Sequence, residues 1–182
     1  MRIISGKYKS RRFRLPKNFR ARPTTDMARE GLFNILNNII DWEHTEALDL
    51  FSGTGGVALE FVSRGCPRVI SVESNTQNHA FIQDVKSQLD AKELLTIKAD
   101  VFTFIKSCNQ SFNLIFADPP YDFVQLDTIP AKILEHNLLN DKGILILEHS
   151  ENNSFTEHPL FKEERKYGSV RFSFFEKHQV TE

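Results

Sequence analysis

A short stretch of this sequence joins an apolar run to a rigid turn that could hold a planar amine. Residues 114–117 are apolar and predict a buried strand, and Asp118, Pro119, Pro120 and Tyr121 follow at once. Each proline fixes φ at about −65° and lacks an N–H, and the residue before a proline is kept extended. The carboxyl end of a strand is where open α/β sheets bind ligands. An exocyclic amine of a nucleobase could donate to Asp118 and a carbonyl oxygen while its ring stacks on Tyr121, although a purely structural turn would show the same letters.

A glycine turn earlier in the chain indicates a second ligand-binding element. Gly53 and Gly55 follow an apolar strand over 47–51 and precede a helix that runs to about Arg64. Glycine lets a backbone pass close to a ligand, and the N-terminus of the next helix offers unpaired N–H groups. This pattern alone occurs in nicotinamide enzymes and in methyl-donor enzymes, and a tight strand-to-helix turn without a ligand is equally compatible with it.

Four carboxylates make the interpretation more specific, because each lies at or near the end of a successive predicted strand. They are Asp49, Glu73, Asp100 and Asp118. Glu73 could accept both hydroxyls of a ribose, Asp100 could receive the 6-amino group of an adenine, and Asp49 could face the amino group of an amino acid. Each acid alone could be a helix cap or a surface residue, and Glu73 fits NAD equally well. Together they predict a pocket for an adenosyl amino acid beside the amine-binding turn.

The elements that must position these residues alternate between strand and helix. Further strands are expected at 68–73, 94–97 and 143–147, and a hairpin at 161–176 that turns at Tyr167 and Gly168. The helices are expected after Thr25 or Asp26, after a capping box formed by Ser74 and Gln77, around 101–105, and from about 128 to 138. We therefore predict an α/β fold: a doubly wound, mainly parallel, seven-stranded sheet that ends in an antiparallel hairpin.

The charge of the chain is unevenly distributed. The whole sequence of 182 residues has a net charge of −1, yet residues 1–22 contain nine basic side chains and no acid. We expect residues 1–25 to form an arm that contacts a polyanion and residues 26–182 to form a single domain, although a solvated extension would also be basic. The residues proposed to contact the polyanion are Arg2, Lys7, Lys9, Arg11, Arg12, Arg14, Arg20, Arg22 and Thr24.

Composition disfavours several other classes of protein. Cys66 and Cys108 lack the spacing of metal ligands, so we expect reduced thiols in a cytoplasmic protein. The histidines form no cluster, and we expect no metal site. No apolar run reaches about 18 residues, so we expect no transmembrane helix.

The motifs together resemble a known family. D-x-F-x-G-x-G at 49–55, the acids at 73 and 100 and D-P-P-Y at 118–121 resemble class I S-adenosylmethionine-dependent methyltransferases that act on an exocyclic amine. The RsmD family of bacterial ribosomal RNA methyltransferases is the nearer resemblance. It rests on R-I-I-S-G at 2–6, R-P-T-T-D at 22–26, R-E-x-L-F-N-I-L at 29–36, S-R-G at 63–65 and Y-G at 167–168. Two residues depart from the family pattern: Ala58 replaces a frequent third glycine, and Met27 replaces a basic residue.

The resemblance implies methyl transfer from S-adenosylmethionine to the N2 amine of a guanine in 16S ribosomal RNA, within a small-subunit particle. The catalytic residues would be Asp118, Pro119, Pro120 and Tyr121. The cofactor-binding residues would be Asp49, Phe51, Gly53, Gly55, Glu73, Asp100 and Val101. We expect a monomer. A DNA adenine or cytosine N-methyltransferase and a non-catalytic RNA-binding assembly factor remain alternatives, whereas an NAD dehydrogenase would not explain the residues at 119–121.

Overall fold

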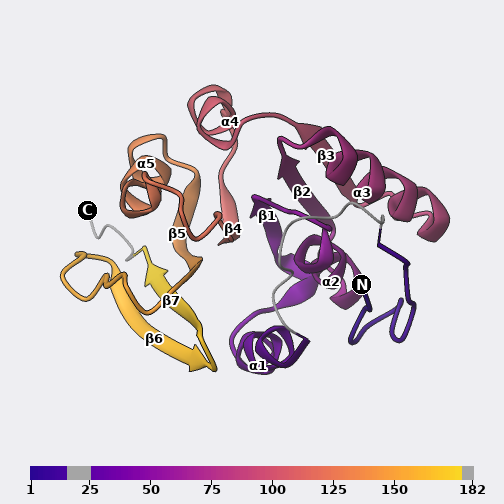
Figure 1. The fold of residues 1–182 in the computed structure, drawn as a ribbon, viewed down its shortest axis with the longest axis horizontal. Helices are drawn as coiled ribbons and strands as arrows, with labels where there is room; N and C mark the ends of the chain where they lie inside the picture. Colours follow the sequence, from indigo (N-terminus) through magenta and orange to yellow (C-terminus); the bar gives the residue numbers. More distant parts are fainter. Residues whose placement is uncertain (16–25, 178–182) are drawn as a thin grey trace.

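The computed structural model describes residues 1–15 and 26–177, which contain one seven-stranded sheet (Figure 1). The strands are β1 (Glu46–Leu50), β2 (Arg68–Glu73), β3 (Leu94–Lys98), β4 (Phe112–Ala117), β5 (Leu139–His149), β6 (Phe161–Tyr167) and β7 (Val170–Glu176). Their order is β3-β2-β1-β4-β5-β7-β6. Strands β1 to β5 pair in parallel, and β7 is antiparallel to both β5 and β6. The predicted mainly parallel sheet with a closing hairpin is confirmed.

Helices cover both faces of this sheet. They are α1 (Asp26–Leu36), α2 (Gly56–Arg64), α3 (Thr76–Leu89), α4 (Val101–Ser107) and α5 (Ile129–Glu135), with short 3-10 turns at Trp42–His44 and Leu126–Thr128. Helices α1, α2 and α3 share one buried apolar cluster with the sheet, and α4 and α5 share a second cluster on the opposite face. No helix in the described ranges, 1–15 and 26–177, is long and apolar enough to cross a membrane.

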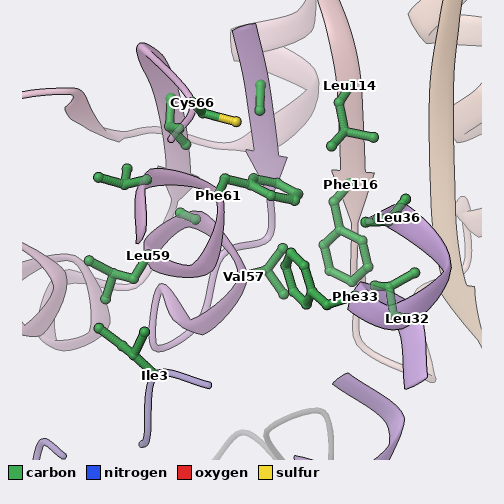
Figure 2. Close-up of a cluster of buried hydrophobic side chains, with 14 of the residues drawn as sticks. Ile3, Leu32, Phe33, Leu36, Val57, Leu59, Phe61, Cys66, Leu114 and Phe116 are labelled. Atoms are coloured by element: carbon green, nitrogen blue, oxygen red, sulfur yellow. The ribbon is translucent and has the colours of Figure 1, made fainter. Parts of the chain in front are cut away.

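The central strands are apolar on both faces because both faces are covered. Leu114 and Phe116 of β4 belong to the first cluster, whereas Ile115 between them belongs to the second. Figure 2 shows Phe116 in the first cluster together with Phe33 of α1 and Phe61 of α2. The ring centroids of Phe33 and Phe61 are 5.6 Å apart in an edge-to-face arrangement. This packing fixes the position of α1 over the carboxyl half of the sheet.

Strand order reverses between β1 and β4, and this reversal decides where a ligand can bind. β1 is followed outward by β2 and β3 on one side and by β4 and β5 on the other. The connections from β1 and β4 therefore leave the sheet on opposite faces, and a crevice opens between them at the carboxyl ends. The glycine turn after β1 and the turn at 118–121 after β4 are the two walls of this crevice.

Residues 1–15 form an ordered arm that folds back on itself. Arg2 and Arg12 form an isolated antiparallel bridge. The Ile3 N–H donates to the Arg11 carbonyl at 3.0 Å. Ile3 and Phe13 are buried in the cluster that contains α1 and α2. The apolar residues between the basic ones thus attach the arm to the domain and leave most of its charges outside.

Three local expectations are wrong. Ser74 does not cap α3; the side chain of Asn75 does, accepting from the N–H groups of Gln77 and Asn78. The last helix ends at Glu135, so Leu138 lies beyond it. Asn137 lies in the left-handed region at φ 54°, a conformation that asparagine adopts more readily than most residues, and it prevents the helix from continuing. Strand β5 begins at Leu139 rather than at 143. The expected helix start at Thr25 lies outside the described residues.

Gly31 should be required where α1 meets the C-terminal hairpin. A Cβ at Gly31 would lie 2.1 Å from Cε1 of Tyr167. Alanine favours a helix over glycine by about 1 kcal/mol, yet we expect Gly31→Ala to lower the free energy of unfolding by about 1–3 kcal/mol through overpacking. Urea titration should show this loss, and it should largely disappear when the substitution is made in a Tyr167→Ala background. A stabilised Gly31→Ala protein would contradict the packing described here.

Candidate active site

A cavity of about 540 Å³ lies at the carboxyl ends of the strands, at the point where the strand order reverses. Every residue predicted to be catalytic or cofactor-binding lines this cavity except Gly55. Its walls are the glycine turn, the end of β2, the start of α4 and the turn at 118–121. The two predicted ligand-binding elements therefore share one hollow large enough for a small-molecule ligand.

The turn at 118–121 remains tied to the sheet beyond the end of β4. The Asp118 N–H donates to the Leu50 carbonyl at 3.2 Å, which extends the β1–β4 pairing by one residue. The Phe123 N–H closes the turn onto the Pro120 carbonyl at 2.9 Å. Tyr121 keeps 49% of its surface exposed at the mouth of the cavity. The carboxylate and the ring are thus presented from a stiff backbone.

The two glycines of the first turn have different reasons to be glycine. Gly53 has φ +53°, and a Cβ there would meet only the Phe51 carbonyl oxygen at 4.0 Å, so its open side faces the cavity. Gly55 has φ +73°, and a Cβ there would lie 2.9 Å from Cγ1 of Ile82 on α3. Gly55 therefore allows α2 and α3 to pack closely, and it lies behind the cavity wall.

Glu73 links the glycine turn to the loop that follows β2. Its Oε2 accepts from the Gly53 N–H at 2.7 Å, and its Oε1 accepts from the Asn75 N–H at 2.7 Å. Each carboxylate oxygen can accept more than one hydrogen bond. Glu73 can therefore shape the glycine turn and still accept from the hydroxyls of a ligand.

Asp49 is almost fully buried, with 1% of its surface exposed. Its Oδ2 accepts from the Ala58 N–H at 3.1 Å, in the first turn of α2. Burial raises the pKa of Asp49 to about 7, and the negative charge of nearby Glu73 adds to this effect. A group that titrates near neutrality at the wall of a cavity is suited to pairing with a bound cation.

Asp100 caps a helix and also lines the cavity. Its Oδ1 accepts from the N–H of Thr103 at 2.9 Å and so caps α4. The residue also lines the cavity next to Val101. The cap fixes the orientation of the carboxylate at the start of α4.

Sequence reasoning missed a buried cation in this cavity. Arg29 on α1 is 5% exposed; its Nη2 donates to the Arg2 carbonyl at 2.7 Å and to Oδ1 of Asp26 at 2.8 Å. Its Nε has no hydrogen-bond partner within the described residues. A signal was present in the sequence, since Arg29 precedes Leu32 and Phe33 by three and four residues and so shares their apolar face.

A buried glutamate was missed as well. Glu148 ends the apolar part of β5 in the way that Asp118 ends β4, and it lines the cavity with 2% of its surface exposed. Together with Asp49, Glu73, Asp100 and Asp118 it brings the number of cavity-lining acids to five. The apolar run before it, at 143–147, was a usable signal.

The basic arm divides into paired and exposed cations. Arg2 forms ion pairs with Asp26 at 3.6 Å and Glu30 at 2.6 Å, and Lys7 pairs with Glu93. The remaining described cations of the arm are exposed: Lys9, Arg11, Arg12 and Arg14. Arg20, Arg22 and Thr24 lie outside the described residues. The exposed cations are therefore the ones best placed to meet a polyanion, while Arg2 and Lys7 attach the arm to the domain.

Comparison with known proteins gives consistent results over nearly the whole chain. The family model described as "Conserved hypothetical protein 95" matches residues 1–176. "Ribosomal RNA small subunit methyltransferase D" of Buchnera aphidicola (subsp. Baizongia pistaciae) is 31% identical over 96% of this chain and 91% of its own. The structure of "Putative methyltransferase yhhF" from Escherichia coli superposes with a TM-score of 0.86 at 25% identity, covering 98% of each chain. SMU.776, "a putative methyltransferase complexed with SAH", shares the fold with a TM-score of 0.68 at 15% identity, over 81% of this chain and 49% of its own.

The titration of Asp49 should make stability depend on pH. The pKa of Asp49 is about 7 in the folded chain and about 4 when unfolded. Between these values only the folded state holds the proton, so wild-type stability falls as pH rises through that window. Asp49→Asn lacks this titration, so its stability relative to wild type should rise by about 1 kcal/mol per pH unit there. Urea titrations at several pH values would measure it, with exposed Asp122→Asn as control. A pH-independent difference would contradict the buried titration.

Proposed function

The chain belongs to the RsmD family of class I methyltransferases, and from this premise we propose that it methylates the N2 amine of a guanine in 16S ribosomal RNA, with S-adenosylmethionine as the donor. The observation that carries the proposal is the single cavity that joins the glycine turn to the turn at 118–121. The name of the Buchnera relative supports ribosomal RNA as the substrate. We extend the proposal to a cytoplasmic monomer that acts on a small-subunit particle.

The residues that line the cavity support S-adenosylmethionine as the ligand. Gly53 leaves its side of the wall open, and Glu73 and Asp100 offer acceptors where a ribose and an adenine amine would bind. At the amino-acid end, Asp49 and Arg29 would face the ammonium and the carboxylate of the ligand. The Nε of Arg29 has no hydrogen-bond partner among residues 1–15 and 26–177, and it is the kind of buried donor that an anionic ligand satisfies. The bound SAH of the related SMU.776 fold supports the same class of cofactor.

When bound, S-adenosylmethionine supplies a methyl group on a positively charged sulfur, which keeps the bonding electrons as the methyl leaves. The turn at 118–121 prepares the amine that receives it. Asp118 and the Pro119 carbonyl would accept hydrogen bonds from the N2 amine and draw its lone pair out of conjugation with the ring. Tyr121 would hold the base flat by stacking, worth about 1–3 kcal/mol. As the N–C bond forms, the amine loses one proton to Asp118 or to water.

The remaining contacts would position the RNA. The target guanine must leave its stack to enter the cavity, and the exposed ring of Tyr121 lies at the mouth. We assign phosphate contacts to the arm formed by residues 1–25, in which Lys9, Arg11, Arg12 and Arg14 are exposed. The methyltransferase domain would be residues 26–182. Positioning and fixed dipoles would supply most of the acceleration, because no covalent intermediate is required.

Asp118 should be essential for transfer and dispensable for cofactor binding. We expect Asp118→Ala to lower the rate on small subunits by about 10²-fold or more, with the Kd for S-adenosylhomocysteine changed less than about twofold. The experiment supplies labelled S-adenosylmethionine with small subunits, naked 16S RNA or duplex DNA, and mass spectrometry identifies the nucleoside formed. The exposed acid of the same loop provides the matched control, Asp122→Ala. Label in adenine or cytosine, or a near-normal rate for Asp118→Ala, would contradict the proposal.

Arg29 should recognise the amino-acid end of the cofactor. Arg29→Met should weaken S-adenosylhomocysteine binding by about tenfold to a hundredfold, because a buried charged hydrogen bond is lost. 5′-Methylthioadenosine lacks the amino-acid carboxylate, so its Kd should hardly change. Isothermal titration of both ligands gives the comparison, and the second ligand controls for damage to the fold. Equal losses for both ligands would restrict Arg29 to a structural role.

A further inference from the structure

Glu148 lies beside Asp118 at the carboxyl edge of the sheet. Ala117 of β4 pairs in parallel with Leu147 of β5, so the next residue on each strand is Asp118 and Glu148 respectively. Neighbouring strands are about 4.8 Å apart, and residues paired across them point to the same face. Both residues line the same cavity. A base amine held by Asp118 would therefore be within reach of a second carboxylate.

Two aromatic residues lie near Glu148 in the sheet. It pairs with Phe172 on β7, and Phe116 lies two residues before Asp118 on the same face. Phe116 and Phe172 pack against each other, with ring centroids 6.3 Å apart. Only 2% of Glu148 is exposed. Glu148 already has an interaction within the protein. A carboxylate has about four acceptor positions, so a held carboxylate can still accept from a ligand.

We propose that Glu148 recognises the Watson–Crick edge of the target guanine, an assignment that rests on the proposed function. One oxygen would accept from the N1–H of the guanine and the other from one N2–H. Asp118 and the Pro119 carbonyl would accept the second N2–H. Asp118 and Glu148 thus both bind the N2 amine, and Glu148 also binds the N1–H beside it.

This arrangement would select guanine by a difference in hydrogen-bond polarity. Guanine has a donor, N1–H, beside its amine, whereas adenine and cytosine have an unprotonated ring nitrogen beside theirs. That nitrogen would direct a lone pair at the carboxylate of Glu148, and a buried acceptor facing another acceptor is unfavourable. The turn at 118–121 accepts any of the three amines, so Glu148 would supply the discrimination that the turn lacks.

The first arm of the test uses the wild-type protein and an analogue. 2-Aminopurine placed at the mapped target position keeps the N2 amine and lacks the N1–H. With the RNA or particle that the protein methylates, wild type should prefer guanine by at least about tenfold in kcat/KM, the range of one good bidentate contact to a base. Equal rates would overturn the proposal without any variant.

The second arm compares Glu148→Gln with wild type on both substrates. The carboxamide can donate to N1 of 2-aminopurine but meets the guanine N1–H less well. The guanine rate should fall by about tenfold to a hundredfold, whereas the 2-aminopurine rate should stay the same or rise. The ratio of the guanine rate to the 2-aminopurine rate is compared between the variant and wild type. This comparison removes the intrinsic difference in reactivity between the two amines. Exposed Glu135 at the end of α5 provides the matched control, Glu135→Gln, which should keep the wild-type ratio.

The outcomes separate this proposal from the function on which it rests. If wild type leaves guanine N2 unmodified, the proposed function fails. If wild type methylates guanine but Glu148→Gln loses both substrates equally, or neither, Glu148 is structural and only this inference fails. Binding of S-adenosylhomocysteine shows whether the variant is folded. If the variant is unfolded, the preference of the wild-type protein for guanine over 2-aminopurine tests the proposal instead.

Discussion

Carboxylates gather in this protein because parallel strands end at a common edge of one sheet. The register pairs Asp49 with Ser71 and with Phe116, and Phe116 with Ile146. Two residues further along β2, β4 and β5 come Glu73, Asp118 and Glu148. Side chains alternate with a period of two, so these acids share the face that α1, α2 and α3 cover. The site depends on this register, since a slip of one residue would turn the acids of a strand to the other face.

Three of these acids, Asp49, Glu73 and Glu148, are buried, which is costly, and the surrounding structure shows how the cost is limited. Backbone N–H groups donate to Asp49 and Glu73. The pKa of Asp49 is raised to about 7, so part of the charge is neutralised near physiological pH. Arg29 contributes a buried positive charge to the same cavity. The apolar clusters on both sides of the sheet supply stability that offsets the cost of burying these carboxylates.

The sequence predicted the fold well because its strands are separate apolar runs divided by glycine, proline and acidic residues. It also predicted most of the residues that line the cavity. A residue that follows a parallel strand lies at the carboxyl edge of the sheet, and this holds whatever the order of the strands. The sequence could not show what depends on local choice between neighbours or on tertiary contacts. Asn75 and Ser74 are adjacent and chemically similar caps. The contact that requires Gly55 is with Ile82, on another helix. The pairing of Lys7 with Glu93 joins residues 86 positions apart.

We propose that a methyl donor and a flipped-out base meet between Gly53 and the turn at 118–121. A crystal structure of the protein with S-adenosylhomocysteine tests it most directly. In that structure the adenosine should lie at Glu73 and Asp100 and the amino-acid end between Asp49 and Arg29. The sulfur should face Asp118, with room for a planar ring against Tyr121. A ligand bound outside this cavity, or a sulfur that faces away from Asp118, would contradict it.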